Sequence, residues 1–221
     1  MKKVIVAFAA AALVGSAQAV LVDSFNAPGG NSILGGTYVG SNNGGGIIGG
    51  NRDYEMIVVA NPLGQFFDVS FGGGLEVTSN GFLTDGDLVL QYDGGPDAAI
   101  GVGGNINNLG TGALAGAFGG DRVRIWFLGN DLPVNVLCQT RLGGAVTAIG
   151  GAVRGPLAGP GFLDVMMNPA AMAAADSLTI KFDAQPSGDY ALGRIETVPE
   201  PATISAIAFG LAAMARRRKK A

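Results

Sequence analysis

Aspartates next to glycine are the residues of this sequence whose types and spacing most readily suggest chemistry. They occur in two runs, Asp85-Gly86-Asp87 and Asp93-Gly94-Gly95-Pro96-Asp97. Carboxylates on glycine-rich turns are ligands that Ca²⁺ uses in proteins, but no complete D-x-[DN]-x-[DN]-G loop with a following glutamate is present. Asp-Gly is also a favoured hairpin turn. We therefore expect turn residues, no metal ligands and no cofactor, and keep a bound calcium ion as the alternative.

Asp53 and Glu55 form another pair of acids, and a strand would place both on one face. Such pairs hydrolyse glycosidic bonds when they face each other across the substrate. The chain has no histidine, the commonest general base and metal ligand. Its single cysteine, Cys138, alternates with Val134 and Val136 as a core thiol would. These observations predict no enzyme activity and no catalytic residues, with a secreted glycan hydrolase as the alternative.

Trp126 and Tyr92 are the candidates for contact with a sugar ring. Trp126 is the only tryptophan, and in an alternating segment it shares a face with Arg122 and Arg124, which indicates partial exposure. An exposed indole beside arginines is suited to glycan binding. The alternative is a tryptophan that shields the core at a sheet edge, with arginine stems packed on it.

The segments that carry these residues alternate with period two or are short apolar runs, as expected of strands. Turn sequences such as Asn80-Gly81 and Gly143-Gly144 separate them. In 74–79 the alternation sets Leu75 and Val77 against Glu76 and Thr78. The predicted strands are 20–25, 54–60, 66–71, 74–79, 88–92, 122–128, 134–141, 161–166, 178–183 and 189–197.

The fold predicted from this pattern is all-β, an antiparallel β-sandwich or jelly roll. One short helix is expected at 169–175. Residues 29–50 and 101–120 are low in complexity and rich in Gly and Asn, so we expect loops or edge segments there.

The charge is segregated along the chain. Seven of the 14 Lys and Arg lie in the two ends, whereas Glu200 is the one acid there, so the body has 7 basic and 16 acidic residues and a net charge of −9. Such a surface repels nucleic acid, and we expect no nucleic-acid partner. It suits a secreted domain that meets cations or neutral polymers.

The N-terminus predicts a signal peptide at residues 1–19. Lys2 and Lys3 precede an apolar run, and Ala17-Gln18-Ala19 is a small-x-small cleavage site, so cleavage is expected after Ala19.

The C-terminus carries a second set of signals at residues 198–221. Pro199-Glu200-Pro201 is followed by an apolar stretch at 202–215 and then by the basic cluster Arg216, Arg217, Arg218, Lys219 and Lys220. Fourteen residues form a helix of roughly 21 Å, marginal for a permanent span, and the basic cluster should stay cytoplasmic.

This order of motif, short transmembrane helix and basic tail resembles the PEP-CTERM sorting signal. The resemblance implies recognition of Pro199, Glu200 and Pro201 by an exosortase, transient anchoring in the inner membrane, removal of the tail, and delivery to the cell surface or extracellular matrix. An ordinary, permanent tail anchor is the alternative; its mature chain would keep the basic cluster.

The body at residues 20–197 also resembles bodies found among PEP-CTERM proteins, for which no activity is firmly assigned. The shared motifs are Leu-Val-Asp-Ser-Phe at 21–25, Gly-Gly-x-Arg-Asp at 49–53 and Tyr-Asp-Gly at 92–94. We therefore expect a structural or weakly polysaccharide-binding component of the surface or matrix of an exopolysaccharide-producing bacterium.

Overall fold

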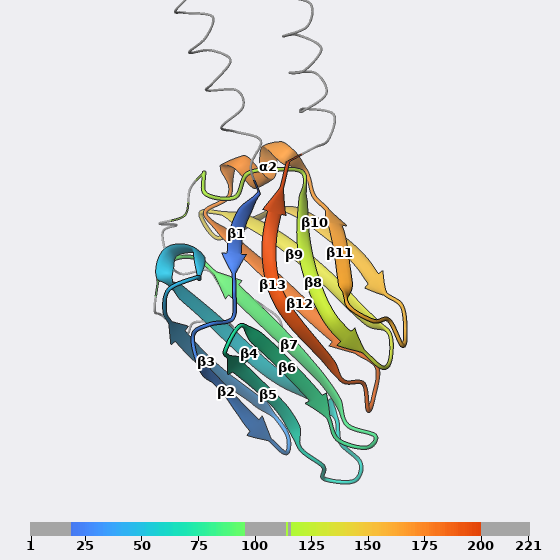
Figure 1. Cartoon of the computed structure of the whole chain (residues 1–221). Coiled ribbons are helices and arrows are strands. Elements are labelled where there is room, and N and C mark those ends of the chain that lie inside the picture. The colour runs from blue at the N-terminus through green and yellow to red at the C-terminus, as the bar shows by residue number, and fades with distance from the viewer. Residues whose placement is uncertain (1–18, 96–113, 115, 200–221) are drawn as a thin grey trace, which may run out of the picture.

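The computed structural model describes residues 19–95, 114 and 116–199, which form two antiparallel β-sheets packed face to face (Figure 1). The predicted all-β sandwich is confirmed. Within those ranges no helix is long and apolar enough to cross a membrane. Residues 1–18 of the predicted signal peptide and the predicted sorting helix lie outside the described residues.

The first sheet has seven strands in the order β11-β8-β13-β6-β5-β2, with β1 paired to β13. In chain order these are β1 (Val20–Asp23), β2 (Gly29–Ile33), β5 (Phe67–Gly72), β6 (Leu75–Asn80), β8 (Arg122–Asn130), β11 (Gly161–Met166) and β13 (Tyr190–Val198).

The second sheet has six strands in the order β10-β9-β12-β7-β4-β3. They are β3 (Thr37–Asn43), β4 (Asn51–Ala60), β7 (Asp85–Tyr92), β9 (Val134–Leu142), β10 (Ala145–Arg154) and β12 (Ser177–Ala184). The short elements are the 3-10 turn η1 (Ile48–Gly50) and helix α2 (Pro169–Ala174), whose first turn is capped by the Asn168 side chain.

Alternating apolar residues of both sheets meet in one core, as the period-two pattern predicts. Val123, Ile125 and Phe127 of β8 face Val136 and Cys138 of β9 across the sandwich, and all are buried. The prediction that Cys138 is a core thiol is confirmed, and burial raises its pKa.

Strand β6 presents to the core the face opposite to the one its hydrophobicity suggests. Glu76 and Thr78 are fully buried, whereas Leu75 is 41% exposed and Val77 is 40% exposed. The Thr78 hydroxyl donates to Glu76 Oε1, and Arg52 provides a positive charge in the same interior. A polar interior therefore turns the apolar side chains of this strand outward, onto the open face of the first sheet.

The period-two pattern of the sequence does not predict three of the strands. Residues 29–50, expected to be loops or edge segments, contain β2, β3 and η1, and β10 was not predicted. All three strands lie at sheet edges, so the expectation of edge segments at 29–50 is confirmed. Most of the other low-complexity segment, 101–120, lies outside the described residues.

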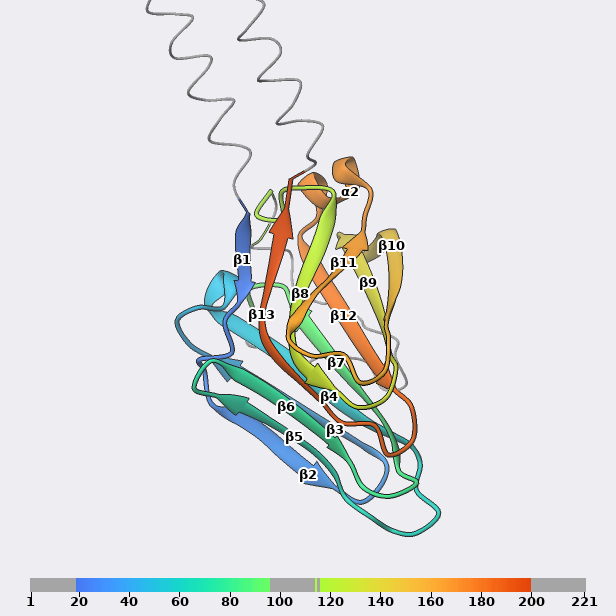
Figure 2. The same ribbon diagram turned by 45° about the vertical axis from the view of Figure 1, so that its right-hand side comes forward.

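The two ends of the body lie side by side. Val20 of β1 pairs with Thr197 of β13, and the backbone N–H of Asp121 donates to the Val198 carbonyl at 3.1 Å. β1 enters and β13 leaves at the same end of the sandwich, next to α2 (Figure 2). Pro199, the first residue of the Pro-Glu-Pro motif, therefore follows the end of β13 directly.

Candidate functional site

The open face of the first sheet gathers aromatic and charged side chains from three neighbouring strands. Register places Trp126 of β8 between Phe162 of β11 and Arg194 of β13, and places Arg124 between Asp164 and Glu196. We call this set the Trp126 surface; it comprises Arg124, Trp126, Phe162, Asp164, Arg194 and Glu196.

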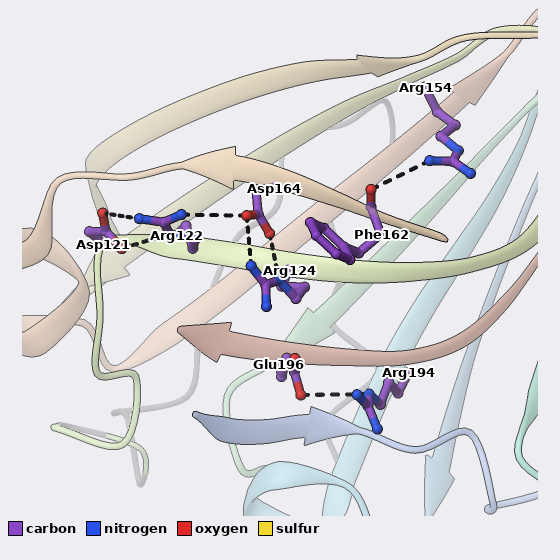
Figure 3. Close-up of polar contacts among 8 residues, drawn as sticks. All are labelled: Asp121, Arg122, Arg124, Arg154, Phe162, Asp164, Arg194 and Glu196. Atoms are coloured by element: carbon purple, nitrogen blue, oxygen red, sulfur yellow. Dashed lines mark hydrogen bonds and ion pairs between the residues drawn. The ribbon is translucent and has the colours of Figure 1, made fainter. Parts of the chain in front are cut away.

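Ion pairs hold one side of this surface in place (Figure 3). Arg124 donates two hydrogen bonds to Asp164, at 2.8 and 2.9 Å, and Arg122 donates two to Asp121, at 2.9 and 2.8 Å. Hydrogen bonding from Arg124 lowers the pKa of Asp164. The Arg124 guanidinium lies 4.2 Å from the Phe162 ring centroid, so the paired charges also fix an aromatic ring.

Trp126 borders a shallow depression of about 400 Å³. Its ring is 6.4 Å from that of Phe162 and 5.8 Å from the Arg194 guanidinium. The depression exists because Gly193 has no side chain: a Cβ there would lie 3.1 Å from Trp126 Cδ1 and 3.5 Å from Leu128 Cδ2. Leu75, turned outward by the inverted face of β6, lines its other side.

A second depression of about 490 Å³ continues along the same strands, and Leu128 lines both. Its walls include Val77, Asn130, Asp131 and Asp189. Backbone N–H groups fix the two carboxylates, since Asp189 Oδ1 accepts from Asn80 and Asp131 Oδ1 accepts from Leu132 and Asp189. Together the depressions form a groove with an aromatic and cationic end and an acidic end.

The interpretation of Tyr92 as a glycan contact is wrong. Its side chain is fully buried, and its hydroxyl donates to Asp23 Oδ2 at 2.9 Å. Tyr92 shares its strand face with Leu88 and Leu90, which are also core residues. Trp126, by contrast, is partly exposed on the face that it shares with Arg122 and Arg124.

Tyr92 belongs to a buried polar cluster between the sheets. Arg52 donates to Asp23 at 2.7 Å with both side chains fully buried, and its guanidinium lies 3.9 Å from the Phe71 ring centroid. Asp23 also accepts from the backbone N–H of Phe25 at 2.7 Å. The three sequence motifs of the body, around Asp23, Arg52 and Tyr92, thus meet at one ion pair, which indicates a role in holding the fold.

The acids considered as calcium ligands lie at the two ends of β7, roughly 20 Å apart. Asp87 pairs with Lys181 at 2.6 Å, and Asp93 accepts from Gln91 and from the backbone of Gly95. Asp85 and Gly86 belong to β7 rather than to a turn, and Asp97 lies outside the described residues. No group of three or more His, Cys, Asp or Glu suited to a metal occurs in the part of the chain that the structure describes.

Asp53 and Glu55 share a face of β4, and both side chains are fully buried. Glycosidase carboxylates must reach the bond they cleave. These two acids therefore do not line an open substrate cleft.

Comparison with known families decides the nature of the C-terminus. The family model described as "PEP-CTERM protein-sorting motif" matches residues 197–219. The chain carries a PEP-CTERM sorting motif. The match begins at Thr197, in β13, so the PEP-CTERM motif is continuous with the last strand of the body. Ala17 and the residues from Glu200 to Lys220 named above lie outside the described residues, while Ala19 is exposed.

Two solved structures are similar to the body that precedes the PEP-CTERM motif. One is a family 11 carbohydrate-binding module from Clostridium thermocellum in complex with a β-1,3-1,4-mixed-linked tetrasaccharide, 9% identical over 82% of this chain and 95% of that chain, with a TM-score of 0.36. The other is the enzymatically active domain of tailspike protein 4 of bacteriophage CBA120, 10% identical over 80% of this chain and 20% of that chain, with a TM-score of 0.37. No curated protein matches the chain in sequence. Likenesses this distant say nothing about the site.

Proposed function

We propose that the protein is an exported component of the bacterial surface or extracellular matrix whose body binds polysaccharide, without catalysis, through the Trp126 surface. An exosortase recognises Pro199, Glu200 and Pro201, the chain is held briefly in the inner membrane, and the tail is then removed.

The sorting part of the proposal rests on the PEP-CTERM motif at 197–219. A predicted signal peptide precedes the body, and the basic residues from Arg216 to Lys220 would keep the tail on the cytoplasmic side. Because both ends of the body lie at one end of the sandwich, both signals can reach the same membrane without distorting the fold.

The binding part rests on one observation: a partly exposed tryptophan borders a depression floored by a glycine and flanked by ordered charged side chains. An indole face supplies apolar contact to a sugar ring, while arginines and carboxylates supply hydrogen bonds to its substituents. The groove extends from Trp126 to Asn130, roughly 13 Å along β8, which fits a chain of sugars better than one ring.

Binding is preferred to hydrolysis because of where the acids lie. Asp53 and Glu55 are buried. Hydrogen bonding from Arg124, together with its positive charge, lowers the pKa of Asp164, the opposite of what a general acid needs.

Replacement of Trp126 by alanine tests the proposal. We expect Trp126→Ala to weaken binding to the extracellular polysaccharide of the producing bacterium about tenfold or more, since it removes the stacking surface. Affinity electrophoresis and isothermal titration calorimetry of the body, residues 20–197, would measure this.

Phe82→Ala is the matched control, because Phe82 is 67% exposed in the loop between β6 and β7 and lines neither depression of the groove. It should bind as the wild type does. Equal affinities for the two variants, or turnover of the polymer by the wild type, would contradict the proposal.

A further inference from the structure

Arg194 is the more loosely held of the two arginines of the Trp126 surface. Its side chain is 55% exposed, and its ion pair with Glu196 is long, at 3.6 Å (Figure 3). Arg122 and Arg124 instead each donate two hydrogen bonds to one carboxylate at 2.9 Å or less. A guanidinium has five N–H donors, so Arg194 has donors to offer a ligand.

Arg194 also lies where a ligand would stack. Its guanidinium is 5.8 Å from the Trp126 ring centroid, and both residues line the depression that Gly193 opens. A sugar ring stacked on Trp126 would therefore bring its substituents within reach of a forked donor that matches planar anions.

The local charge differs from that of the body as a whole. A net charge of −9 favours neutral or cation-bridged polymers. Three of the seven basic residues of the body nevertheless lie on this face, at Arg122, Arg124 and Arg194, where Asp121, Asp164 and Glu196 balance them. An anion is thus not repelled at this place by uncompensated acids.

The end of the groove that lies far from Arg194 is acidic and disfavours anions. Asp131 and Asp189 line the second depression, roughly 16 Å from Arg194 along β13. Carboxylates accept hydrogen bonds from sugar hydroxyls and repel anions. An anionic substituent is therefore directed to the Arg194 end.

We propose that the groove is specific for an acidic polysaccharide, with Trp126 stacking on a sugar ring whose carboxylate or sulfate group Arg194 binds. This inference rests on the proposed function and adds the chemical class of the ligand.

The test compares three soluble polymers: hyaluronan, in which a uronate alternates with an uncharged sugar, the same polymer after chemical reduction of its carboxyl groups, and a galactan sulfated on alternate sugars. Wild type, Arg194→Gln and Trp126→Ala are titrated with each polymer by calorimetry at fixed ionic strength. Arg141→Gln, on β9 of the other sheet, makes the same change in charge away from the groove.

We expect the wild type to bind hyaluronan, the sulfated galactan or both at least tenfold more tightly than the reduced polymer. Arg194→Gln should remove that preference and leave affinity for the reduced polymer within about twofold, whereas Arg141→Gln should retain it. If the wild type prefers one of the two acidic polymers, that preference shows whether Arg194 binds a carboxylate or a sulfate group.

If carboxyl reduction leaves the wild-type affinity unchanged and the sulfated galactan binds no better, or if Arg194→Gln weakens all polymers equally, the acidic specificity is wrong. Loss of binding in Trp126→Ala would then still support the proposed function. Absence of binding to these polymers and to the native polysaccharide would overturn both.

Discussion

Single residues in this protein act through their burial. Arg52 and Asp23 form an ion pair with no exposed surface, and Asn42 Oδ1 and the Ala27 carbonyl accept further hydrogen bonds from Arg52. Removing one partner of such a pair typically costs 3–5 kcal/mol, because the other charge stays buried. The cluster therefore fixes how the first strand sits against the core.

Glu76 lies in the same interior and makes the fold sensitive to pH. Burial raises its pKa from the ordinary 4.5 to about 8, and Oε2 has no hydrogen-bond partner among the described residues. Because the folded state holds this proton more tightly than the unfolded state, the free energy of unfolding should fall as pH rises from about 4.5 to about 8.

The expected slope from this group is at most about 1.4 kcal/mol per pH unit. Glu76→Gln should remove that part of the fall and make the protein more stable than wild type at pH 8. Urea unfolding between pH 5 and pH 9 measures both, with the exposed-site variant Asp68→Asn as control. Parallel curves for wild type and Glu76→Gln would mean that Glu76 does not titrate in this window.

At the candidate site, the sequence predicted the partly exposed Trp126 with its two arginines but not their neighbours. Phe162, Asp164 and Arg194 reach the site through the pairing of β8 with β11 and β13, and pairing between strands cannot be derived from alternation alone. Tyr92 was misjudged although its alternation with Leu88 and Leu90 already placed it on a core face.

At the scale of elements, the sandwich is closed along one side by two edge strands from different sheets. β10 ends the second sheet and β11 ends the first. Gly150 lets the two approach: a Cβ there would overlap the Met166 carbonyl oxygen and lie 2.7 Å from Met167 Sδ. The neighbouring Gly151 has more room, with Val136 O as its nearest contact at 3.6 Å.

Gly150→Ala should therefore destabilise the protein by about 1–3 kcal/mol through overpacking. Gly151→Ala should change the free energy of unfolding by less than about 0.5 kcal/mol. Chemical denaturation of the two variants beside wild type measures the difference. Equal midpoints would show that β10 and β11 separate without cost.

Most central strands were predictable because they alternate between core and solvent, as in β8 and β9. The edge strands β2, β3 and β10 were not. Glycine and polar residues dominate β2 and β3. In β10 the burial does alternate, but small residues such as Gly150 take the inward positions and Ile149 and Val153 face outward, so hydrophobicity does not mark its core face. The facing of β6 was not predicted for another reason: Glu76 and Thr78 hydrogen-bond to each other inside the sandwich, and local hydrophobicity does not reveal such a buried polar pair.

At the scale of the whole molecule, the sorting motif meets the fold without a linker. Pro199 is buried directly after β13, and the Val198 carbonyl is already bonded to Asp121. Excision at Pro-Glu-Pro would therefore leave a body that ends at or close to its last strand.

Replacing both Pro199 and Pro201 by alanine should leave the full-length protein in the inner membrane, since the recognition motif is lost. Fractionation and intact mass spectrometry of the product would show whether the residues from Arg216 to Lys220 remain. The control replaces two exposed prolines of one loop, Pro156 and Pro160, by alanine. Normal sorting of the Pro199 and Pro201 variant would refute the motif as a signal.

The pairing of β1 with β13 also has a consequence for folding during synthesis and export. The strand made first has its partner in the strand made last, so this contact has nearly the largest sequence separation that the body allows. Contacts between residues far apart in the sequence form slowly, because the chain between them must be ordered before the contact is made. Until Thr197 has left the ribosome and crossed the membrane, the first sheet keeps an unpaired strand, and the exported chain must be protected from aggregation for that interval.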